Sequence, residues 1–278
     1  MTKSIYKKGK NIFHKTPFFI PAKKLYYLAR ETVLKFRNTV FPTAIILLYH
    51  RIAEPEHDIY KLSVSPENFE NQLIYLSEKF KIISLSELAN SLKSKRLNKD
   101  CLIITFDDGY ADNLYNALPI LEKHGIPATI FVITGKIGDS TPFFWEESAL
   151  EKDRGRCVNL EELKKLSSSK FIEIGAHTVN HLKLSGIGAE EQDKEIAGSK
   201  QTLNKLLDIP ISSFAYPFGG KEAFDEDIVN LVRKNGFDYA CSNIHKRVNK
   251  NTPLHILPRF VVRNWNVKEL EQKMNKWL

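Results

Sequence analysis

Short apolar runs alternate along the chain with segments whose apolar residues recur at helical spacing, from residue 44 onward. Eight runs rich in β-branched residues are predicted strands, at 44–50, 81–85, 101–108, 128–134, 171–177, 212–219, 237–242 and 255–262. Five segments between them are predicted helices, at 65–80, 110–125, 159–169, 188–209 and 225–236. Strands that are apolar on both faces and separated by helices predict a parallel sheet covered by helices. Eight such units favour a closed or nearly closed β/α barrel over an open sheet.

Residues at the ends of three predicted helices support these limits. Ser65 can cap the first helix, with Pro66 in its opening turn. Gly125 and Gly236 each follow a helix, at the position that favours a left-handed backbone.

Positive charge is concentrated before the first predicted strand. The chain carries a formal net charge of +8, but residues 1–40 hold ten Lys and Arg against one acid, Glu31. The remainder is nearly neutral, with 31 basic and 32 acidic side chains. We therefore expect a basic helical arm at 1–40 and a main domain at 41–278.

Residues 22–37 of the arm have the spacing of an amphipathic helix. Its apolar residues lie near one face: Leu25, Leu28, Ala29, Val33 and Phe36. Such a helix suits an anionic membrane surface, where each nearby basic residue contributes on the order of 1 kcal/mol. The same face could instead pack on the main domain, because amphipathicity does not identify what the face contacts.

No segment has the character of an export signal or a membrane span. The first twenty residues lack a continuous apolar core, and no run of about 18 apolar residues occurs. We therefore expect a cytoplasmic protein, at the inner face of a membrane if the arm binds lipid. The near-neutral remainder argues against nucleic acid as a partner. Three widely spaced cysteines, Cys101, Cys157 and Cys241, indicate neither a disulfide framework nor a CxxC zinc site.

Ionisable residues gather at the carboxyl ends of the predicted strands, where a β/α barrel carries its functional groups. His50 ends the first strand, and Asp107 and Asp108 end the third. Gly109 lets the backbone turn behind the two carboxylates. Neighbouring strand residues point to opposite sides, so both carboxylates reach one site only if the chain leaves strand geometry there. Taken alone, an Asp-Asp-Gly sequence is also common turn chemistry.

His177 and His181 follow the fifth predicted strand at a spacing of four. Two imidazoles and one carboxylate are a standard three-ligand set for catalytic zinc, which leaves one position open for water. If Asp108 is that carboxylate, Asp107 remains free to take a proton. Without the aspartates, two histidines four residues apart would more often be surface residues than a metal site. The carboxylates and imidazoles together predict a hydrolytic metal site that still needs a general acid.

The sequences TFDDGY at 105–110 and HTVNH at 177–181 resemble the first two motifs of the polysaccharide deacetylases, the NodB-homology or carbohydrate esterase family four proteins. The similarity extends over most of 44–262. The resemblance implies a distorted β/α barrel of seven or eight strands and metal-dependent removal of N- or O-acetyl groups from sugars. It also implies Asp107 as general base, with Asp108, His177 and His181 as ligands of zinc or of a similar divalent ion, Co²⁺, Ni²⁺ or Mn²⁺.

The family's third motif is altered in this chain. Where the family usually has Arg-x-Pro-Tyr, this chain has alanine followed by Tyr216, Pro217 and Phe218, which are the expected substrate-binding residues. The backbone N–H of Phe218 can still serve an oxyanion, but the arginine that orients the base is missing. Arg259, in the last predicted strand, is the candidate replacement, because a barrel can present it to the same carboxylate from another strand. An ordinary salt-bridged arginine is the alternative.

The family's last motif, Leu-x-His, carries the general acid and normally lies near the C-terminus. Here Leu48-Tyr49-His50 has this pattern on the first strand, whereas His255 has proline instead of leucine two residues before it. Branches that resemble the poly-N-acetylglucosamine deacetylases have a circularly permuted barrel, in which the motif-bearing strand comes first. The first and last strands of a closed barrel are neighbours, so the permutation preserves the site. We therefore expect His50 to be the acid rather than His255.

Two aromatic residues, Phe144 and Trp145, follow the fourth strand in a predicted loop. Aromatic faces stack on sugar rings, so Trp145 is an expected substrate wall, and a hydrophobic lid over the barrel rim is equally compatible. The sequence thus predicts a metal-dependent hydrolase that deacetylates an N-acetylated sugar of a glycan, a glycolipid or a lipid-linked precursor. A glycan-binding protein that retains the metal site is the alternative. No residue indicates which sugar or linkage is recognised.

Overall fold

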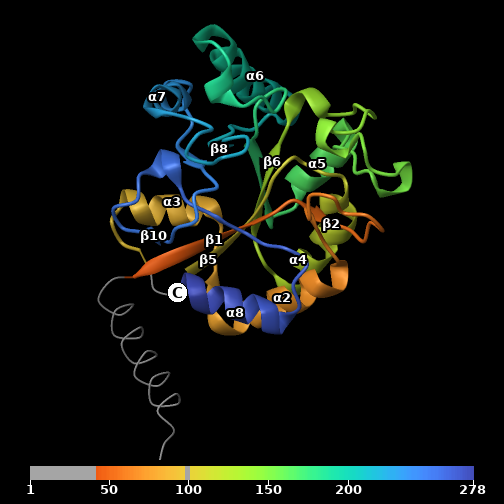
Figure 1. The fold of residues 1–278 in the computed structure, drawn as a ribbon. Helices are drawn as coiled ribbons and strands as arrows, with labels where there is room; N and C mark the ends of the chain where they lie inside the picture. Colours follow the sequence, from red (N-terminus) through yellow and green to blue (C-terminus); the bar gives the residue numbers. More distant parts are fainter. Residues whose placement is uncertain (1–41, 98–100) are drawn as a thin grey trace, which may run out of the picture. The chain divides into compact units, whose positions relative to one another are not determined.

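The computed structural model describes residues 42–97 and 101–278, drawn in colour in Figure 1. The predicted basic arm at 1–40 lies outside the described residues, so its helix and its membrane contact stay predictions. Each helix among the described residues is too short or too polar to cross a bilayer.

A curled sheet of mainly parallel strands forms the centre of the fold (Figure 1). Its main path runs β10 (Val248–Asn249), β1 (Thr43–Tyr49), β5 (Cys101–Phe106), β6 (Ala128–Val132), β7 (Ile172–Ala176), β8 (Ser213–Ala215) and β9 (Tyr239–Cys241). Two short strands join this sheet off the path, β4 (Lys81–Ile82) beside β5 and β11 (Phe260–Val261) beside β1. A separate pair, β2 (Arg51–Ile52) and β3 (Ser63–Val64), follows β1.

The first and last strands of the sheet are neighbours. Strand β11 pairs in parallel with β1, with Leu47 opposite Phe260. A few residues earlier, Leu257 forms a bridge with Cys241 of β9. The segment that leads into β11 therefore lies between the two ends of the sheet and nearly closes it. The predicted β/α barrel is confirmed, and so is the adjacency of its first and last strands, on which the permuted position of His50 depends.

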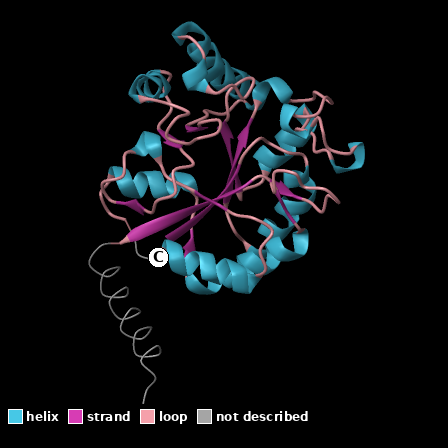
Figure 2. Cartoon of the chain, viewed as in Figure 1, coloured by secondary structure: helices cyan, strands magenta, loops and turns pink. Residues whose placement is uncertain are grey.

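Helices surround the strands (Figure 2). They are α2 (Pro66–Lys79), α3 (Leu85–Lys93), α4 (Leu118–His124), α5 (Leu160–Ser168), α6 (Ala189–Leu207), α7 (Glu226–Lys234) and α8 (Val267–Trp277). A π-helical turn at Asn113–Ala117 precedes α4, and single 3₁₀ turns occupy Thr134–Lys136, Phe144–Glu146, Glu151–Asp153, Leu184–Gly186 and Leu254–Ile256. Apolar side chains from both faces of the sheet are buried, as continuous apolar strands require.

The five predicted helices are present, and their boundary residues behave as expected. The Ser65 side chain accepts a hydrogen bond from the N–H of Asn68 at 3.2 Å, and Gly125 and Gly236 have φ angles of 65° and 76°. Two further helices, α3 and α8, were not predicted. The predicted strand at 81–85 ends at Ile82, because Ser84 caps α3 by accepting from the N–H of Glu87 at 3.1 Å.

Candidate active site

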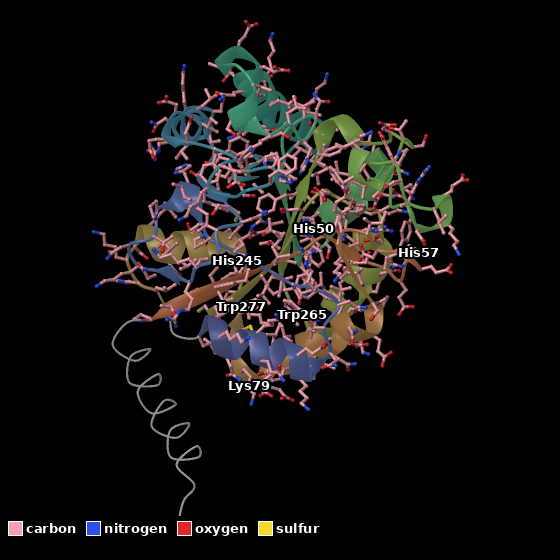
Figure 3. The ribbon with its side chains drawn as sticks, in the orientation of Figure 1. His50, His57, Lys79, His245, Trp265 and Trp277 are labelled. Atoms are coloured by element: carbon pink, nitrogen blue, oxygen red, sulfur yellow. The ribbon has the colours of Figure 1, made fainter. Side chains whose placement is uncertain are left out.

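The register between β1 and β5 brings the ends of these two strands together. Leu48 lies opposite Thr105, so His50 and Asp107, two residues further along each strand, project to the same side at the same level. The N–H of Asp107 donates to the carbonyl of Tyr49 at 3.0 Å. In Figure 3 His50 lies well inside the ring of helices, whereas His57 lies at its periphery.

The chain leaves strand geometry directly after Asp107. Asp108 and Gly109 have φ angles of 72° and 70°, in the left-handed region. This turn allows both carboxylates to face one site, which two successive strand residues could not do. A Cβ at Gly109 would lie 3.0 Å from a methyl group of Val132, so a larger residue would be crowded there as well as strained by the left-handed backbone. Asp107 and Asp108 are 2% and 3% exposed.

Arg259 forms a bidentate ion pair with Asp107. Its Nη1 and Nη2 atoms donate to the two carboxylate oxygens at 2.8 and 2.7 Å. The guanidinium is fully buried and also donates to the Thr105 hydroxyl at 3.2 Å. Burial by itself would raise the pKa of Asp107, but the charge and hydrogen bonds of Arg259 outweigh burial and hold it at about 2. Asp107 is therefore ionised at neutral pH, the state that a proton acceptor requires.

Asp108, His177 and His181 form a compact group whose ligand atoms all lie within 4.8 Å of one another. The Nε2 atoms of both histidines lie 3.6 Å from Oδ1 of Asp108. Nδ1 of His177 lies 2.8 Å from the carbonyl oxygen of Ala215. Because a carbonyl oxygen can only accept, Nδ1 carries the proton and Nε2 presents its lone pair to the group.

The properties of this group fit a divalent cation. Burial, followed by the charge of Asp107, raises the pKa of Asp108 well above its usual value. Burial lowers the pKa of His181 far below its usual value, which keeps the imidazole neutral. A cation between one carboxylate and two neutral imidazoles would offset the charge that burial disfavours. The segment is also held in an uncommon conformation, since Thr178 and His181 have φ angles of 62° and 58°.

A pocket of about 360 Å³ surrounds these groups. Its lining includes seven of the predicted site residues together with four others: His50, Asp107, Asp108, Trp145, His177, His181 and Phe218, then Tyr60, Leu62, Phe144 and Asn243. His255 is not among them, and its Nε2 atom lies 2.8 Å from the carbonyl oxygen of Phe237. Between the two candidate acids, only His50 lines the pocket.

Tyr216 and Pro217, the other two expected substrate-binding residues of the third motif, are not among the residues that line this pocket. Both are buried, and the Tyr216 ring stacks on Phe224 with a centroid distance of 4.1 Å. The Tyr216 hydroxyl donates to the carbonyl of His255 at 2.9 Å. The third-motif segment therefore exposes only Phe218 to the pocket, with 48% exposure and a φ angle of 62°.

Aromatic rings enclose the His181 side of the pocket. The ring centroid of Trp145 lies 4.8 Å from that of His181, and the Phe218 centroid lies 5.0 Å from it. Phe144 is 56% exposed and packs edge-on against Trp145. The predicted aromatic wall thus lies directly beside the candidate metal ligands.

Asn243 is a pocket residue that the sequence patterns did not identify. Its Oδ1 atom accepts from Nη2 of Arg259 at 2.8 Å, and its Nδ2 atom donates to the Phe218 carbonyl at 3.1 Å. It follows β9 by two residues, so inspection of that strand's carboxyl end would have found it. Tyr60 lies in the connection between β2 and β3, where no local pattern marks it.

Comparison with known proteins gives consistent results. The family model described as polysaccharide deacetylase matches residues 94–240. The poly-beta-1,6-N-acetyl-D-glucosamine N-deacetylase of Staphylococcus aureus is 28% identical over 250 residues, which cover 82% of this chain and 81% of that protein.

Solved structures agree with the sequence comparisons. The Streptococcus pyogenes deacetylase PplD, in complex with acetate, superposes with a TM-score of 0.69 and 25% identity, covering 84% of this chain and 99% of that one. IcaB from Ammonifex degensii shares the fold, with a TM-score of 0.66, 21% identity, and coverage of 85% of this chain and 97% of that one. The family match spans more than half of the chain and includes both aspartates and both histidines of the pocket. The chain belongs to the polysaccharide deacetylase family.

Proposed function

We propose that this protein is a metal-dependent hydrolase that removes acetyl groups from N-acetylated sugars of a glycan. One observation carries the proposal: a single pocket of this polysaccharide deacetylase contains Asp107, His50 and three potential metal ligands. Asp107 is paired there with a buried arginine. The pairing of Asp107 with Arg259 argues against the glycan-binding alternative, which was motivated by the missing arginine of the third motif.

In this proposal Asp108, His177 and His181 would hold a divalent ion, with zinc as the first candidate. When bound, such an ion would supply Lewis-acid chemistry at the acetyl carbonyl and would lower the pKa of water at the site. Asp107 accepts a proton from the water that attacks the carbonyl carbon. Arg259 holds both oxygens of Asp107 in place and keeps it ionised before the reaction. The backbone N–H of Phe218 donates to the oxygen that becomes negative.

His50 is the proposed general acid. The C–N bond breaks as the sugar nitrogen takes a proton, so that acetate and an amine leave. Burial lowers the pKa of His50 to about 4, against the opposing effect of Asp107, so the resting imidazole is neutral. Negative charge that develops on the acetyl oxygen would raise this pKa, so the proton that Asp107 takes from the water can pass to His50, which delivers it to the sugar nitrogen as the C–N bond breaks.

The substrate class rests on the relatives and on the aromatic wall. The Staphylococcus aureus relative is named for poly-beta-1,6-N-acetyl-D-glucosamine, which makes N-acetylglucosamine oligomers the first substrates to test. Trp145 and Phe218 can stack on the apolar face of a sugar ring. A lipid-linked sugar and contact of residues 1–40 with a membrane surface remain predictions from charge and amphipathicity.

Acetate release from β-1,6-linked N-acetylglucosamine oligomers tests the proposed function. We expect release by the full-length protein, loss of at least about tenfold after treatment with a chelator, and recovery when Zn²⁺ or Co²⁺ is returned, because the buried carboxylate and imidazoles need a cation to act on the carbonyl. Oligomer binding without acetate release, with the metal present, would favour the glycan-binding alternative. Release that a chelator leaves unchanged would reject the metal-dependent mechanism.

His50→Gln and His255→Gln distinguish the two candidate acids. We expect His50→Gln to lower kcat by about 10²- to 10⁴-fold, because glutamine cannot deliver a proton to the amine. His255→Gln should leave kcat nearly unchanged, since His255 lies outside the pocket and glutamine can still donate to the carbonyl of Phe237. Steady-state kinetics on the same oligomer give both values. The reverse ranking would assign the acid to His255.

A further inference from the structure

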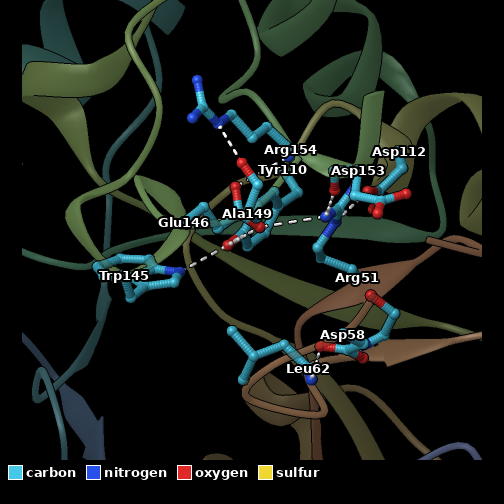
Figure 4. Close-up of polar contacts among 12 residues, drawn as sticks. Arg51, Asp58, Leu62, Tyr110, Asp112, Trp145, Glu146, Ala149, Asp153 and Arg154 are labelled. Carbon is cyan, nitrogen blue, oxygen red and sulfur yellow. Dashed lines mark hydrogen bonds and ion pairs between the residues drawn. The ribbon is translucent and has the colours of Figure 1, made fainter. Parts of the chain in front are cut away.

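A chain of buried hydrogen bonds ends at the indole of Trp145 (Figure 4). Nε1 of Trp145 donates to the hydroxyl oxygen of Tyr110 at 2.9 Å, and the Tyr110 hydroxyl donates to Oε1 of Glu146 at 3.2 Å. The same carboxylate oxygen accepts from Nη1 of Arg51 at 3.1 Å. Tyr110 is fully buried, and Arg51 and Glu146 are 9% and 7% exposed. The pocket wall is thus connected to a buried ion pair.

Arg51 attaches this chain to the barrel. It directly follows His50, and its guanidinium lies 5.2 Å from the ring centroid of Tyr110. Its Nε atom donates to Asp112 at 3.0 Å and its Nη1 atom also donates to the carbonyl of Asp153 at 2.8 Å. One side chain therefore holds the turn after β5 and both ends of the 146–153 segment.

Glu146 has no carboxylate oxygen directed at the pocket. Its second oxygen, Oε2, accepts from the N–H of Gly155 at 2.8 Å. The backbone at Gly155 passes so close to Tyr110 that a Cβ there would lie 2.5 Å from the ring. The segment 146–155 therefore folds back so that its two ends are hydrogen-bonded to each other, and the Tyr110 ring packs against it.

Ring stacking restricts the indole further. Phe143 stacks on Trp145 with a centroid distance of 4.8 Å and an interplanar angle of 8°, and Tyr110 packs against Phe143 at 4.7 Å. Trp145 is thus positioned by its ring face and by its single N–H donor. A buried ion pair adds little net stability over apolar residues of similar size, because desolvation offsets the attraction. Its directional hydrogen bonds, however, specify one orientation, which apolar packing alone does not do.

We infer that Arg51, Glu146 and Tyr110 are positioning residues that orient the Trp145 indole for substrate binding. The inference rests on the proposed function, because it assigns Trp145 to the wall against which the acetylated sugar binds. It assigns Arg51 to a role separate from proton transfer, although it is the immediate neighbour of the proposed acid. Loss of the Tyr110 hydroxyl should weaken substrate binding while the reacting groups stay in place.

Tyr110→Phe is the test, because it removes one hydroxyl and keeps the ring and the Arg51–Glu146 pair. We expect KM for the N-acetylglucosamine oligomer to rise roughly threefold to tenfold, the effect of one lost hydrogen bond, with kcat within about twofold of the wild type. The indole N–H of Trp145, assigned by NMR with Trp145→Phe, should exchange with water about tenfold faster. Tyr115→Phe is the matched control, since the Tyr115 hydroxyl bonds to Glu162 and its side chain is 57% exposed.

The results of these two measurements can be distinguished from a failure of the proposed function. An unchanged exchange rate of the Trp145 indole in Tyr110→Phe would overturn the positioning role, whatever the activity. Faster exchange with unchanged KM would overturn the assignment of Trp145 to substrate binding. A wild-type protein that releases no acetate would reject the proposed function instead, while the exchange rate would still test the chain of hydrogen bonds. Arg51→Lys, which keeps one charge but cannot reach all three partners, should raise both KM and the exchange rate.

Discussion

Asp107→Asn is expected to lower acetate release by about 10²- to 10⁴-fold while metal content stays near that of the wild type. The substitution keeps the shape of the side chain but removes the carboxylate that would accept the proton. The three potential ligands, Asp108, His177 and His181, are unchanged, so metal binding should persist. Acetate release and metal analysis on the same preparation measure the two effects together.

The variant also changes the charge that Arg259 faces. Asparagine leaves a fully buried guanidinium without its counter-charge, which costs about 3–5 kcal/mol when one partner of a buried pair is removed. A lower Tm is therefore expected, and circular dichroism at the assay temperature must show a folded protein. Asp225→Asn is a matched control, because Asp225 caps α7 far along the chain and asparagine caps helices equally well. Wild-type turnover by a folded, metal-loaded Asp107→Asn protein would remove Asp107 from the mechanism.

His181→Ala is expected to weaken metal binding by at least about 100-fold and to abolish acetate release at ordinary metal concentrations. The imidazole Nε2 atom lies 3.6 Å from Oδ1 of Asp108, and alanine leaves only Asp108 and His177 in the group. Dialysis against defined metal concentrations, followed by elemental analysis, measures the affinity. High Zn²⁺ should restore part of the activity, because the base Asp107 is still present.

His124→Ala is the control for this effect. His124 is partly buried and pairs with Glu70 at 2.7 Å on the outer helices, so its removal should leave metal content unchanged. Full metal occupancy in His181→Ala would assign the ion to other ligands. Equal loss in both variants would indicate destabilisation and not a missing ligand.

The strand–helix alternation and four residues of the site could be predicted from local patterns. Asp107 and Asp108 end an apolar strand before a glycine, and His177 and His181 lie four residues apart after another strand. These signals are local, because the end of a strand, a glycine turn and the spacing of two histidines each depend on residues that are close in sequence. Helices α3 and α8, which the sequence analysis does not predict, carry local signals of the same kind in their caps, Ser84 and Asn266.

The contacts between distant residues were decided only by the tertiary structure. Arg259 meets Asp107 across 152 positions, Arg51 meets Glu146 across 95, and Asn243 joins Arg259 to Phe218. Tyr216, expected at the substrate, lies instead in the core. By itself the sequence determined which residues stand at strand ends and how the backbone can turn there. Which of them meet depends on strand order, register and the reach of long side chains, and these are set when the first and last strands pair and the whole core packs.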